Sequence, residues 1–364
     1  MKITIIAGAR PNFMKIAPII HAIQEASNNG VDLSFRLVHT GQHYDKKMSA
    51  TFFEELNIPH PNVNLECGGG SQAEQTAAIL VSFEKELLAN PTDLVLVVGD
   101  VTSTMACSIV AKKLNTKVAH VEAGIRSFDL TMPEEINRMV TDSITDYYFT
   151  TSEIANENLK KEGALQSQIF YVGNVMIDTL LKNEARFTKP QIFEELKLEG
   201  KKYFVLTMHR PANVDEANKL KLLMNEIVDN TQGLPIIFPI HPRTAKIFSD
   251  LGISNDRLKI IEPLGYLEFN YLVKNAKAVI TDSGGITEET TVMGVPCLTL
   301  RDNTERPETI TIGTNELVGT NPDNIKPALE LLFSGNWKKG GIPHLWDGKA
   351  AKRIVDFLIK EFNE

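Results

Sequence analysis

Short runs of apolar residues recur along the chain, and amphipathic stretches separate them. In the first half these runs are ITIIA (3–7), SFRLVHT (34–40), DLVLVVGD (93–100), KVAHVEAG (117–124), DYYFTT (146–151) and IFYVG (169–173). Strands that are apolar without alternation, with helices between them, are typical of a parallel sheet covered on both faces. The pattern therefore predicts an α/β chain with doubly wound, Rossmann-like sheets.

The pattern lapses over a charged stretch, NEARFTKPQIFEELKLEGKK, and then restarts. The later runs are YFVLTMH (203–209), PIIFPIH (235–241), LKIIEP (258–263), AVITDSGG (278–285) and PCLTLR (296–301). A chain of 364 residues is also longer than one hydrophobic core usually serves. We expect two Rossmann-like domains, 1–185 and 186–347, facing a central cleft. A last helix within 348–364 is expected to pack back onto the first domain.

Charge and composition exclude several classes of function. The net charge of −8 argues against a surface that binds nucleic acid or an anionic membrane, because both ligands are negatively charged and are bound by basic surfaces. The opening MKITIIAGARPNF lacks the layout of a signal peptide, and no apolar run approaches the roughly 20 residues that span a bilayer. Cys67, Cys107 and Cys297 lie far apart without CxxC spacing, which predicts neither a disulfide scaffold nor a zinc site. We expect a cytoplasmic protein that holds no metal.

Ionisable or small polar residues follow nearly every predicted strand. Ligands of parallel α/β sheets bind beyond the carboxyl ends of the strands, so these residues are the candidates for a site. In the first half they are Arg10, Lys15, Asp100, Glu122, Glu134 and Arg138, and in the second half they are His209, His241, Ser283, Gly284, Gly285, Glu289, Arg301 and Arg306.

The DSGG turn at 282–285 is suited to bind a phosphate group. Glycines let backbone N–H groups approach phosphate oxygens at the positive end of the next helix, and a glutamate one turn further can accept hydrogen bonds from a ribose diol. No GK[ST] follows the turn, so it is not a P-loop, and GxGxxG is absent after every strand. The sequence therefore predicts no nicotinamide or flavin cofactor.

Each candidate also has a purely structural explanation. Asp100 could cap a helix that begins at Thr102. Glu134 and Arg138, four residues apart, could form a solvated ion pair on one helix face. His209 and His241 could be core or capping histidines. These separate explanations do not account for the aggregate, because both halves of the chain contribute charged residues at their strand ends.

The order of several motifs resembles one family, the non-hydrolysing UDP-N-acetylglucosamine 2-epimerases of bacteria and archaea, over essentially the whole chain. The matching segments are GARPNFMK (8–15), HTGQHYD (39–45), VGDVTST (98–104), HVEAGIRS (120–127), MPEEINR (132–138), GNVMIDTL (173–180), HRPAN (209–213), HPRT (241–244), TDSGGITEE (281–289) and RDNTERPE (301–308). The resemblance implies a fold like that of GT-B glycosyltransferases, a homodimer, and no cofactor.

The resemblance also implies residue roles. Asp100, Glu122 and Glu134 match the acid/base carboxylates, and His209 joins them as a catalytic residue. By the same matches the substrate-binding residues are Arg10, Lys15, Phe269, Ser283, Gly284, Gly285, Glu289 and Arg306, with Phe269 near the uracil and Glu289 on the ribose. Arg138, His241 and Arg301 join the substrate-binding set because they follow predicted strands. Gln42 and His43 match part of an allosteric site, although ECGGGSQAEQ (66–75) lacks the arginine expected there.

The reaction that the resemblance implies is also the one that the chemistry allows. H2 of the sugar is not next to a carbonyl, and oxidation of a neighbouring carbon would need a nicotinamide. The remaining route is elimination, in which a carboxylate removes H2 as UDP leaves C1, followed by protonation of C2 on the other face and return of UDP.

Four alternatives stay open at this point. An epimerase of UDP-2,3-diacetamido-2,3-dideoxy-glucuronic acid would use the same mechanism and similar motifs. A GT-B glycosyltransferase would pass the sugar to an acceptor, and a hydrolysing epimerase would release the free sugar. A nucleotide-sugar-binding regulator would carry no acid/base carboxylates.

Overall fold

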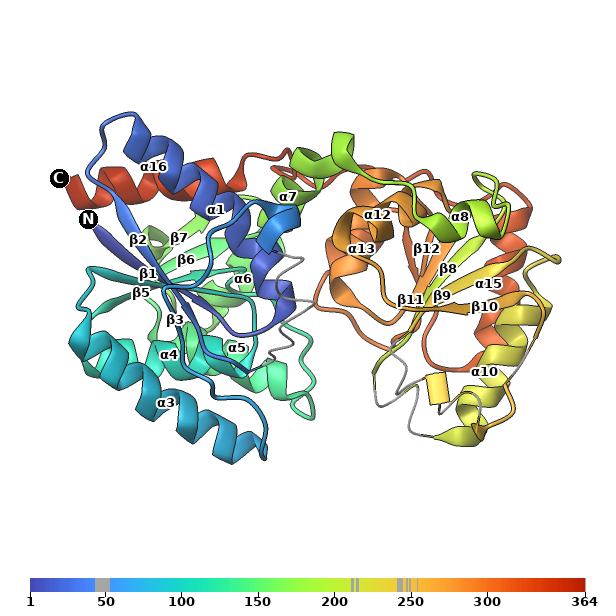
Figure 1. The fold of residues 1–364 in the computed structure, drawn as a ribbon, viewed down its shortest axis with the longest axis horizontal. Coiled ribbons are helices and arrows are strands. Elements are labelled where there is room, and N and C mark those ends of the chain that lie inside the picture. The colour runs from blue at the N-terminus through green and yellow to red at the C-terminus, as the bar shows by residue number, and fades with distance from the viewer. Residues whose placement is uncertain are drawn as a thin grey trace. The chain divides into compact units, whose positions relative to one another are not determined.

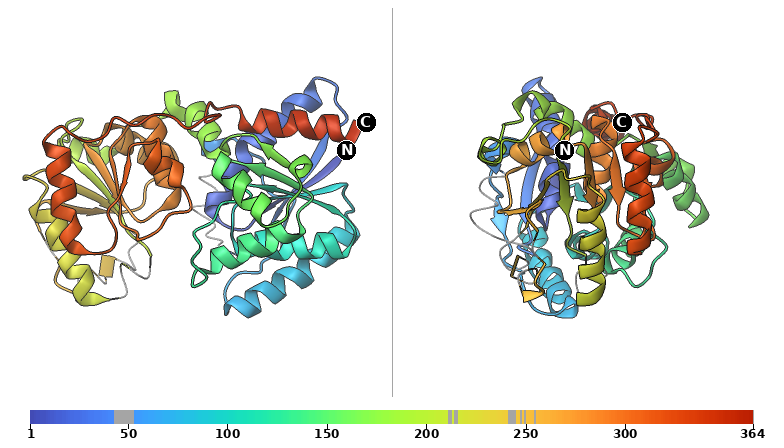
Figure 2. Two further views of the ribbon diagram at one scale, coloured as in Figure 1. Left: turned by 180° about the vertical axis from the view of Figure 1, so that it is seen from behind. Right: turned by 90° about the vertical axis from the view of Figure 1, so that its right-hand side faces the viewer.

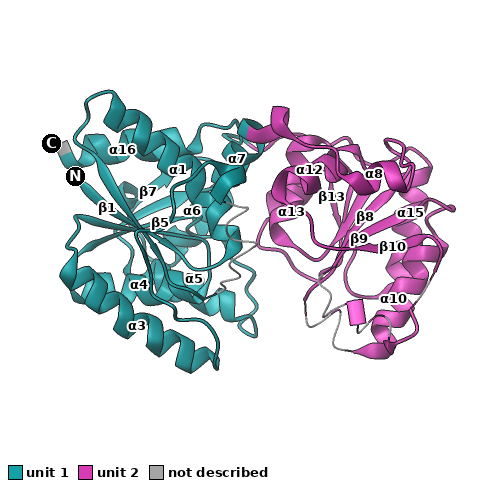
Figure 3. Ribbon diagram, viewed as in Figure 1, with its two compact units in different colours: residues 1–182, 344–364 teal, residues 183–343 magenta. Residues whose placement is uncertain are grey.

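The computed structural model describes residues 1–42, 53–210, 213, 216–240, 245, 246, 248, 250–253 and 255–363. The chain forms two compact units, Met1–Lys182 with His344–Glu364 and Asn183–Pro343 (Figure 3). Each unit has its own parallel sheet, so the predicted pair of doubly wound α/β sheets is confirmed.

Unit 1 contains a seven-stranded sheet in the order β3-β2-β1-β4-β5-β6-β7. Its strands are β1 (Lys2–Ala7), β2 (Ser34–His39), β3 (Val63–Asn64), β4 (Leu94–Val98), β5 (Lys117–Val121), β6 (Tyr147–Thr150) and β7 (Ile169–Tyr171), and all pairings are parallel. The order reverses between β1 and β4, which is where such sheets bind ligands.

Helices cover both faces of this sheet. They are α1 (Arg10–Asn28), α3 (Gln72–Ala89), α4 (Thr102–Lys113), α5 (Pro133–Ile144), α6 (Glu153–Lys161), α7 (Val175–Asn183) and α16 (Ala350–Asn363), with a 3-10 turn η1 (Gln166–Gln168). Figures 1 and 2 show α16, in red, alongside the blue α1, although the two are far apart in sequence. Helices α3, α4 and α5 pack in succession on the opposite face.

Unit 2 contains a six-stranded sheet in the order β10-β9-β8-β11-β12-β13, with its reversal between β8 and β11. Its strands are β8 (Phe204–Thr207), β9 (Ile236–Pro239), β10 (Leu258–Ile261), β11 (Ala278–Thr281), β12 (Cys297–Thr299) and β13 (Asn315–Leu317). Its helices are α8 (Gln191–Glu195), α10 (Ala217–Asp229), α12 (Tyr266–Asn275), α13 (Gly284–Met293), α14 (Pro307–Thr311) and α15 (Ile325–Phe333), with 3-10 turns η2 (Glu184–Arg186) and η3 (Pro322–Asn324).

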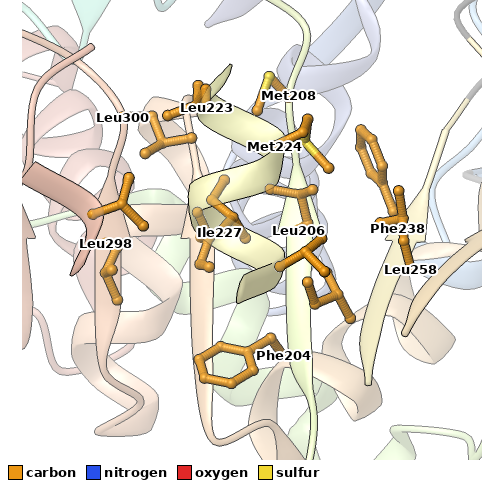
Figure 4. Packing of buried hydrophobic residues seen from close by; sticks show 14 of the residues in the cluster. Phe204, Leu206, Met208, Leu223, Met224, Ile227, Phe238, Leu258, Leu298 and Leu300 are labelled. Carbon is orange, nitrogen blue, oxygen red and sulfur yellow. The ribbon is translucent and has the colours of Figure 1, made fainter. Parts of the chain in front are cut away.

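Apolar side chains fill both faces of the unit 2 sheet. Phe204 and Leu206 of β8 point into one cluster with Met224 and Ile227 of α10 (Figure 4). Val205, between them in sequence, belongs to a second cluster on the other face. Because successive side chains of a strand point to opposite faces, a strand buried on both sides must be apolar at every position. This explains the unbroken apolar runs of the sequence.

Two details differ from the sequence-based expectations. The edge strands β3 and β13 are additional, and each is too short and too polar to produce an apolar run. The units divide at Lys182 and at Pro343, whereas the sequence places boundaries at 185 and 347. The chain re-enters unit 1 before residue 347, because Trp346 is already buried there. It is only 1% exposed, and its Nε1 donates to the Thr151 carbonyl (3.0 Å).

Candidate functional site

The turn after β1 is organised by one asparagine. The Oδ1 atom of Asn12 accepts hydrogen bonds from the backbone N–H groups of Gly8 and Ala9, both at 2.9 Å. Its Nδ2 donates to the Val98 carbonyl at the end of β4 (3.3 Å). Asn12 therefore joins the start of α1 to the neighbouring strand at the point where the strand order reverses.

Lys15, one turn further along α1, forms a buried ion pair with Glu122. The Lys15 Nζ donates to Glu122 Oε2, and the two side chains are 10% and 0% exposed. Glu122 follows β5 directly and has a φ of +70°, a left-handed conformation that costs energy for a residue with a side chain. Glycine suits position 99, where φ is +66° and where a Cβ would lie 2.8 Å from Lys15 Nζ and so displace it. The backbone therefore holds this pair at the ends of β4 and β5.

Asp100 lies beside this pair and is bound by an arginine. Its Oδ2 accepts from Arg138 Nε (3.0 Å) and Nη2 (2.6 Å), while its backbone carbonyl accepts from Asn137 Nδ2 (2.9 Å). The N-cap of α4 is Val101, with no side-chain hydrogen bond, so the interpretation of Asp100 as a helix cap is wrong. The Asp100 side chain remains 22% exposed and accessible to a ligand.

The two glutamates of MPEEINR have different surroundings. Within α5, Arg138 pairs with Glu135 at 2.5 Å, three residues earlier. Glu135 is 1% exposed and also accepts from the backbone N–H groups of Ser127 (3.0 Å) and Phe128 (2.9 Å). Glu134, the residue predicted from sequence, is exposed in the first turn of α5. Glu135 was missed because adjacent glutamates look alike until the helix is placed against the sheet.

A buried histidine supports this end of the sheet. His120 has no exposed surface, and its Nδ1 and Nε2 face Asp142 Oδ1 (2.6 Å) and the Gly99 carbonyl (2.8 Å). Asp142 also contacts Arg126 Nη2 at 2.7 Å. Burial raises the pKa of Asp142, but its pairing with His120 and Arg126 outweighs burial and lowers that pKa. His120 therefore holds the carbonyl of Gly99 rather than facing a ligand.

The predicted allosteric residues are only partly described. Gln42 Oε1 accepts from the backbone N–H (3.2 Å) and the hydroxyl (2.8 Å) of Ser103, at the start of α4. The Ser103 hydroxyl also contacts Thr40 Oγ1 at 2.7 Å. Gln42 thus links the segment after β2 to the start of α4. His43 lies outside the described residues, as does the predicted substrate-binding His241.

In unit 2, His209 is held by a buried aspartate at the reversal between β8 and β11. His209 Nδ1 lies 2.9 Å from Asp282 Oδ1, and the side chains are 64% and 0% exposed. Asp282 Oδ2 accepts from the backbone N–H groups of His209 (3.0 Å) and Arg210 (2.9 Å) and from Asn213 Nδ2 (3.1 Å). Burial raises the pKa of Asp282, but the contacts with His209 and Arg210 outweigh burial and lower it. An exposed imidazole is therefore oriented by a buried carboxylate.

Asp282 was not among the sequence-based candidates. Its signal was present, since it is the residue that follows β11 in TDSGG. That β11 lies next to β8, and so beside His209, is decided by the strand order of the sheet.

The helix that follows Asp282, α13, begins without a capping bond from the side chain of its own N-cap residue. Ser283 is the N-cap of α13 and makes no side-chain capping bond, and Ser283, Gly284 and Gly285 are partly exposed. The first N–H groups of a helix lack partners within the helix and carry a positive partial charge. This end of α13 is suited to bind an anion.

Arginines and carboxylates pair behind the amino end of α13. Arg301 Nη2 lies 2.5 Å from Glu305 Oε2, and Arg306 Nε donates to Glu288. Both arginines are buried, at 3% and 4% exposure. The cations expected to bind substrate are therefore paired with carboxylates of their own unit.

Glu289, the predicted ribose ligand, is also buried in unit 2. Its Oε1 accepts from the Tyr266 hydroxyl at 2.8 Å, and burial raises its pKa to about 7. Phe269, the predicted uracil neighbour, is half-buried against the apolar cluster beneath α12. Arg10 is half-buried at the start of α1 in unit 1.

Two features are absent from the described part of the chain. It contains no group of three or more His, Cys, Asp or Glu side chains placed to hold a metal ion. Within the same described ranges, every helix is too short or too polar to cross a membrane.

Comparison with known proteins gives matches along nearly the whole chain. Residues 24–359 match the family model described as UDP-N-acetylglucosamine 2-epimerase. A UDP-N-acetylglucosamine 2-epimerase of Methanocaldococcus jannaschii is 44% identical over 98% of this chain and 99% of its own. A UDP-2,3-diacetamido-2,3-dideoxy-D-glucuronate 2-epimerase of Pseudomonas aeruginosa is 39% identical over 99% of this chain and 100% of its own.

A solved structure matches equally well. The crystal structure of Methanocaldococcus jannaschii UDP-GlcNAc 2-epimerase in complex with UDP-GlcNAc and UDP has a TM-score of 0.90 and 44% identity, and the match covers 99% of this chain and 100% of that one. The GT-B-like fold expected from the sequence motifs is confirmed by this match. The chain belongs to the UDP-N-acetylglucosamine 2-epimerase family.

Proposed function

We propose that this protein interconverts UDP-N-acetylglucosamine and UDP-N-acetylmannosamine by inverting C2 without hydrolysis. The observation that carries the proposal is the pair of carboxylates at the ends of β4 and β5, each beside a cation: Asp100 with Arg138, and Glu122 with Lys15. Proton removal on one face of C2 and proton delivery on the other require two such groups. The relative from Methanocaldococcus jannaschii, 44% identical, supports the choice of substrate.

The reaction that we propose has two balanced halves. One carboxylate takes H2 as the C1–O bond to UDP breaks, which leaves a 2-acetamidoglucal and UDP. A proton then adds to C2 from the opposite face, and UDP forms the C1–O bond again. Glu134, exposed in the first turn of α5, is a further candidate for one of these proton transfers.

Unit 2 is suited to stabilise the departing diphosphate. The amino end of α13 offers N–H groups, His209 presents an exposed imidazole, and Arg301 supplies a permanent positive charge nearby. Donors placed where charge develops lower the barrier because they need no reorganisation. We therefore assign the nucleotide to unit 2 and the sugar to unit 1. We further propose a cytoplasmic homodimer, which sedimentation of the purified protein checks for the oligomeric state.

A second substrate is the alternative within the same mechanism. The Pseudomonas aeruginosa relative, which is named for UDP-2,3-diacetamido-2,3-dideoxy-D-glucuronate, is 39% identical over 99% of this chain. Direct competition between the two nucleotide sugars, measured as the ratio of kcat/KM, separates the two possibilities. A preference for the diacetamido-glucuronate would move the substrate assignment and keep the mechanism.

The deciding experiment follows the sugar protons by NMR in D2O. With UDP-N-acetylglucosamine as the sole substrate, we expect the manno epimer to form and deuterium to enter C2. Asp100→Asn and Glu122→Gln should each lower kcat by about 10²- to 10⁴-fold, the usual contribution of an acid or base. Asp32→Asn, at an exposed position, is the matched control and should leave kcat unchanged. If neither epimer nor exchange appears with either nucleotide sugar, the epimerase assignment is wrong.

A further inference from the structure

One carboxylate lies where a phosphate group would bind at the amino end of α13. A Cβ at Gly284, the first residue of this ten-residue helix, would lie 2.8 Å from Glu305 Oε1. Ser283 makes no side-chain capping bond there. A carboxylate at this place is stabilised by the helix dipole in the same way as a phosphate. Glu305 therefore has the position and the charge of a bound anion.

Arg301 shows that this carboxylate only partly satisfies the site. Its Nη2 lies 2.5 Å from Glu305 Oε2. Its Nε and Nη1 are buried, and among the described residues no hydrogen-bond partner faces them. The Nη1 atom lies 3.7 Å from the same Cβ position at Gly284. A guanidinium carries five N–H donors, so Arg301 has donors to spare for an anion with more oxygens than a carboxylate has.

The surrounding charge makes a second anion costly while Glu305 stays in place. Glu288, paired with Arg306, and Glu308 are buried in the same cluster. The pKa of Glu308 is raised to about 7, mainly by burial, with Glu288 and Glu305 contributing to the rise and Arg306 opposing it. Like charges a few ångströms apart in a poorly solvated region repel strongly. A diphosphate can therefore use Arg301 and the amino end of α13 only as the Glu305 carboxylate moves away.

We propose that Glu305 is an internal competitor of the nucleotide diphosphate, which weakens nucleotide binding by occupying Arg301 and the amino end of α13. The inference rests on the proposed function, since it concerns the same nucleotide site. Glu305 sets the affinity for every ligand that carries a diphosphate and leaves the affinity for uridine unchanged. Such a device keeps the enzyme from holding UDP too tightly to return it to C1.

The test is calorimetric titration of the wild type, Glu305→Gln and a control variant with UDP, uridine and inorganic pyrophosphate. Glutamine keeps the size of the side chain and removes the charge, so we expect Glu305→Gln to bind UDP and pyrophosphate about tenfold more tightly. Uridine affinity should stay within about twofold. Glu330→Gln, which removes one exposed carboxylate from α15 of the same unit, is the matched control and should bind all three ligands as the wild type does.

Each outcome decides one of the two proposals. Unchanged or weaker binding of UDP and pyrophosphate by Glu305→Gln overturns the role of Glu305, as does an equal gain for uridine. If the wild type fails to bind UDP, the proposed function fails, while pyrophosphate still reports on Glu305. Should Glu305→Gln not fold, Glu305→Asp replaces it, because the shorter side chain withdraws the carboxylate from the helix end. Tighter UDP binding is again expected, and equal or weaker binding overturns the inference.

Discussion

At the scale of single residues, the site is built from buried carboxylates that hold other groups in place. Asp282 accepts from two backbone N–H groups and one side-chain amide while it contacts His209. Glu135 accepts from the backbone N–H groups of Ser127 and Phe128 and from the Arg138 guanidinium. Neither residue needs to touch a substrate. Asp282 orients the exposed His209, and Glu135 fixes the buried Arg138, which in turn binds Asp100. We therefore regard both carboxylates as positioning residues.

Asp282→Asn should lower kcat by at least about tenfold, because an amide cannot orient the His209 ring as the carboxylate does. The fold should survive, since the asparagine Oδ1 still accepts hydrogen bonds. Epimerisation rates of Asp282→Asn, His209→Ala and the double variant measure the coupling. We expect the second substitution to add little to the first. Fully additive losses would mean that Asp282 acts independently of His209.

At the scale of elements, the site depends on tight junctions between strands and helices. Asp100 lies two residues after the end of β4, and the Lys15 side chain of α1 reaches Gly99 between them. A side chain at Gly99 would therefore collide with Lys15 Nζ. A similar closeness at Gly284 brings Glu305 against α13. A side chain at either glycine would displace a charged neighbour, and Gly99 also has a left-handed backbone that favours glycine.

Gly99→Ala tests this closeness against a control with the same backbone conformation. Gly99 has a φ of +66° and its Cβ would lie 2.8 Å from Lys15 Nζ, whereas Gly252 has a φ of +65° and its Cβ would meet no atom of the described residues within 4 Å. Both alanines pay about 1–2 kcal/mol for the left-handed backbone, measured by urea unfolding. Gly99→Ala alone should also displace Lys15 from Glu122 and lower kcat. Equal activity in the two variants would show that the Lys15–Glu122 pair is not needed.

At the scale of the whole molecule, unit 1 is assembled from two segments that are far apart in the chain. The segment from His344 onward is held by the Tyr171 hydroxyl, which donates to the His344 carbonyl (2.7 Å), and by Trp346. The Asp178 carboxylate of α7 accepts from the backbone N–H groups of Ala350 (3.1 Å) and Ala351 (2.7 Å), the first two residues of α16. The C-terminal helix is thus attached to the last helix before unit 2.

Asp178→Asn should change the pH dependence of stability in a defined direction. Burial raises the pKa of Asp178 from 3.8 to about 6, although the backbone N–H groups of Ala350 and Ala351 oppose it. A raised folded-state pKa gives stability that is present in full below about 3.8 and is lost as pH rises through about 6. The free-energy difference between wild type and Asp178→Asn should therefore favour the wild type less at pH 7 than at pH 4. Urea unfolding at both values measures it, and a constant difference would contradict the assignment.

Much of this molecule could be predicted from its sequence. The apolar runs marked every central strand, because a strand buried on both faces has to be apolar throughout. The residues at the ends of those runs included Asp100, Glu122 and His209, because parallel strands bring their carboxyl ends to one edge, and Lys15 lies in the helix that follows the first run. The motif order identified the family. The edge strands β3 and β13 were not predicted, because strands of two and three residues are too short to show a pattern.

The pairings were decided only by the tertiary structure. Whether Glu134 or Glu135 turns inward depends on how α5 packs, and the contact of Asp282 with His209 depends on β11 lying next to β8. The approach of Glu305 to Gly284 likewise joins two segments whose spacing in sequence carries no signal. Sequence alone determined which residues stand at strand ends, because that is a local consequence of burial. Which of them meet is set by strand order and helix rotation, which are properties of the packed chain.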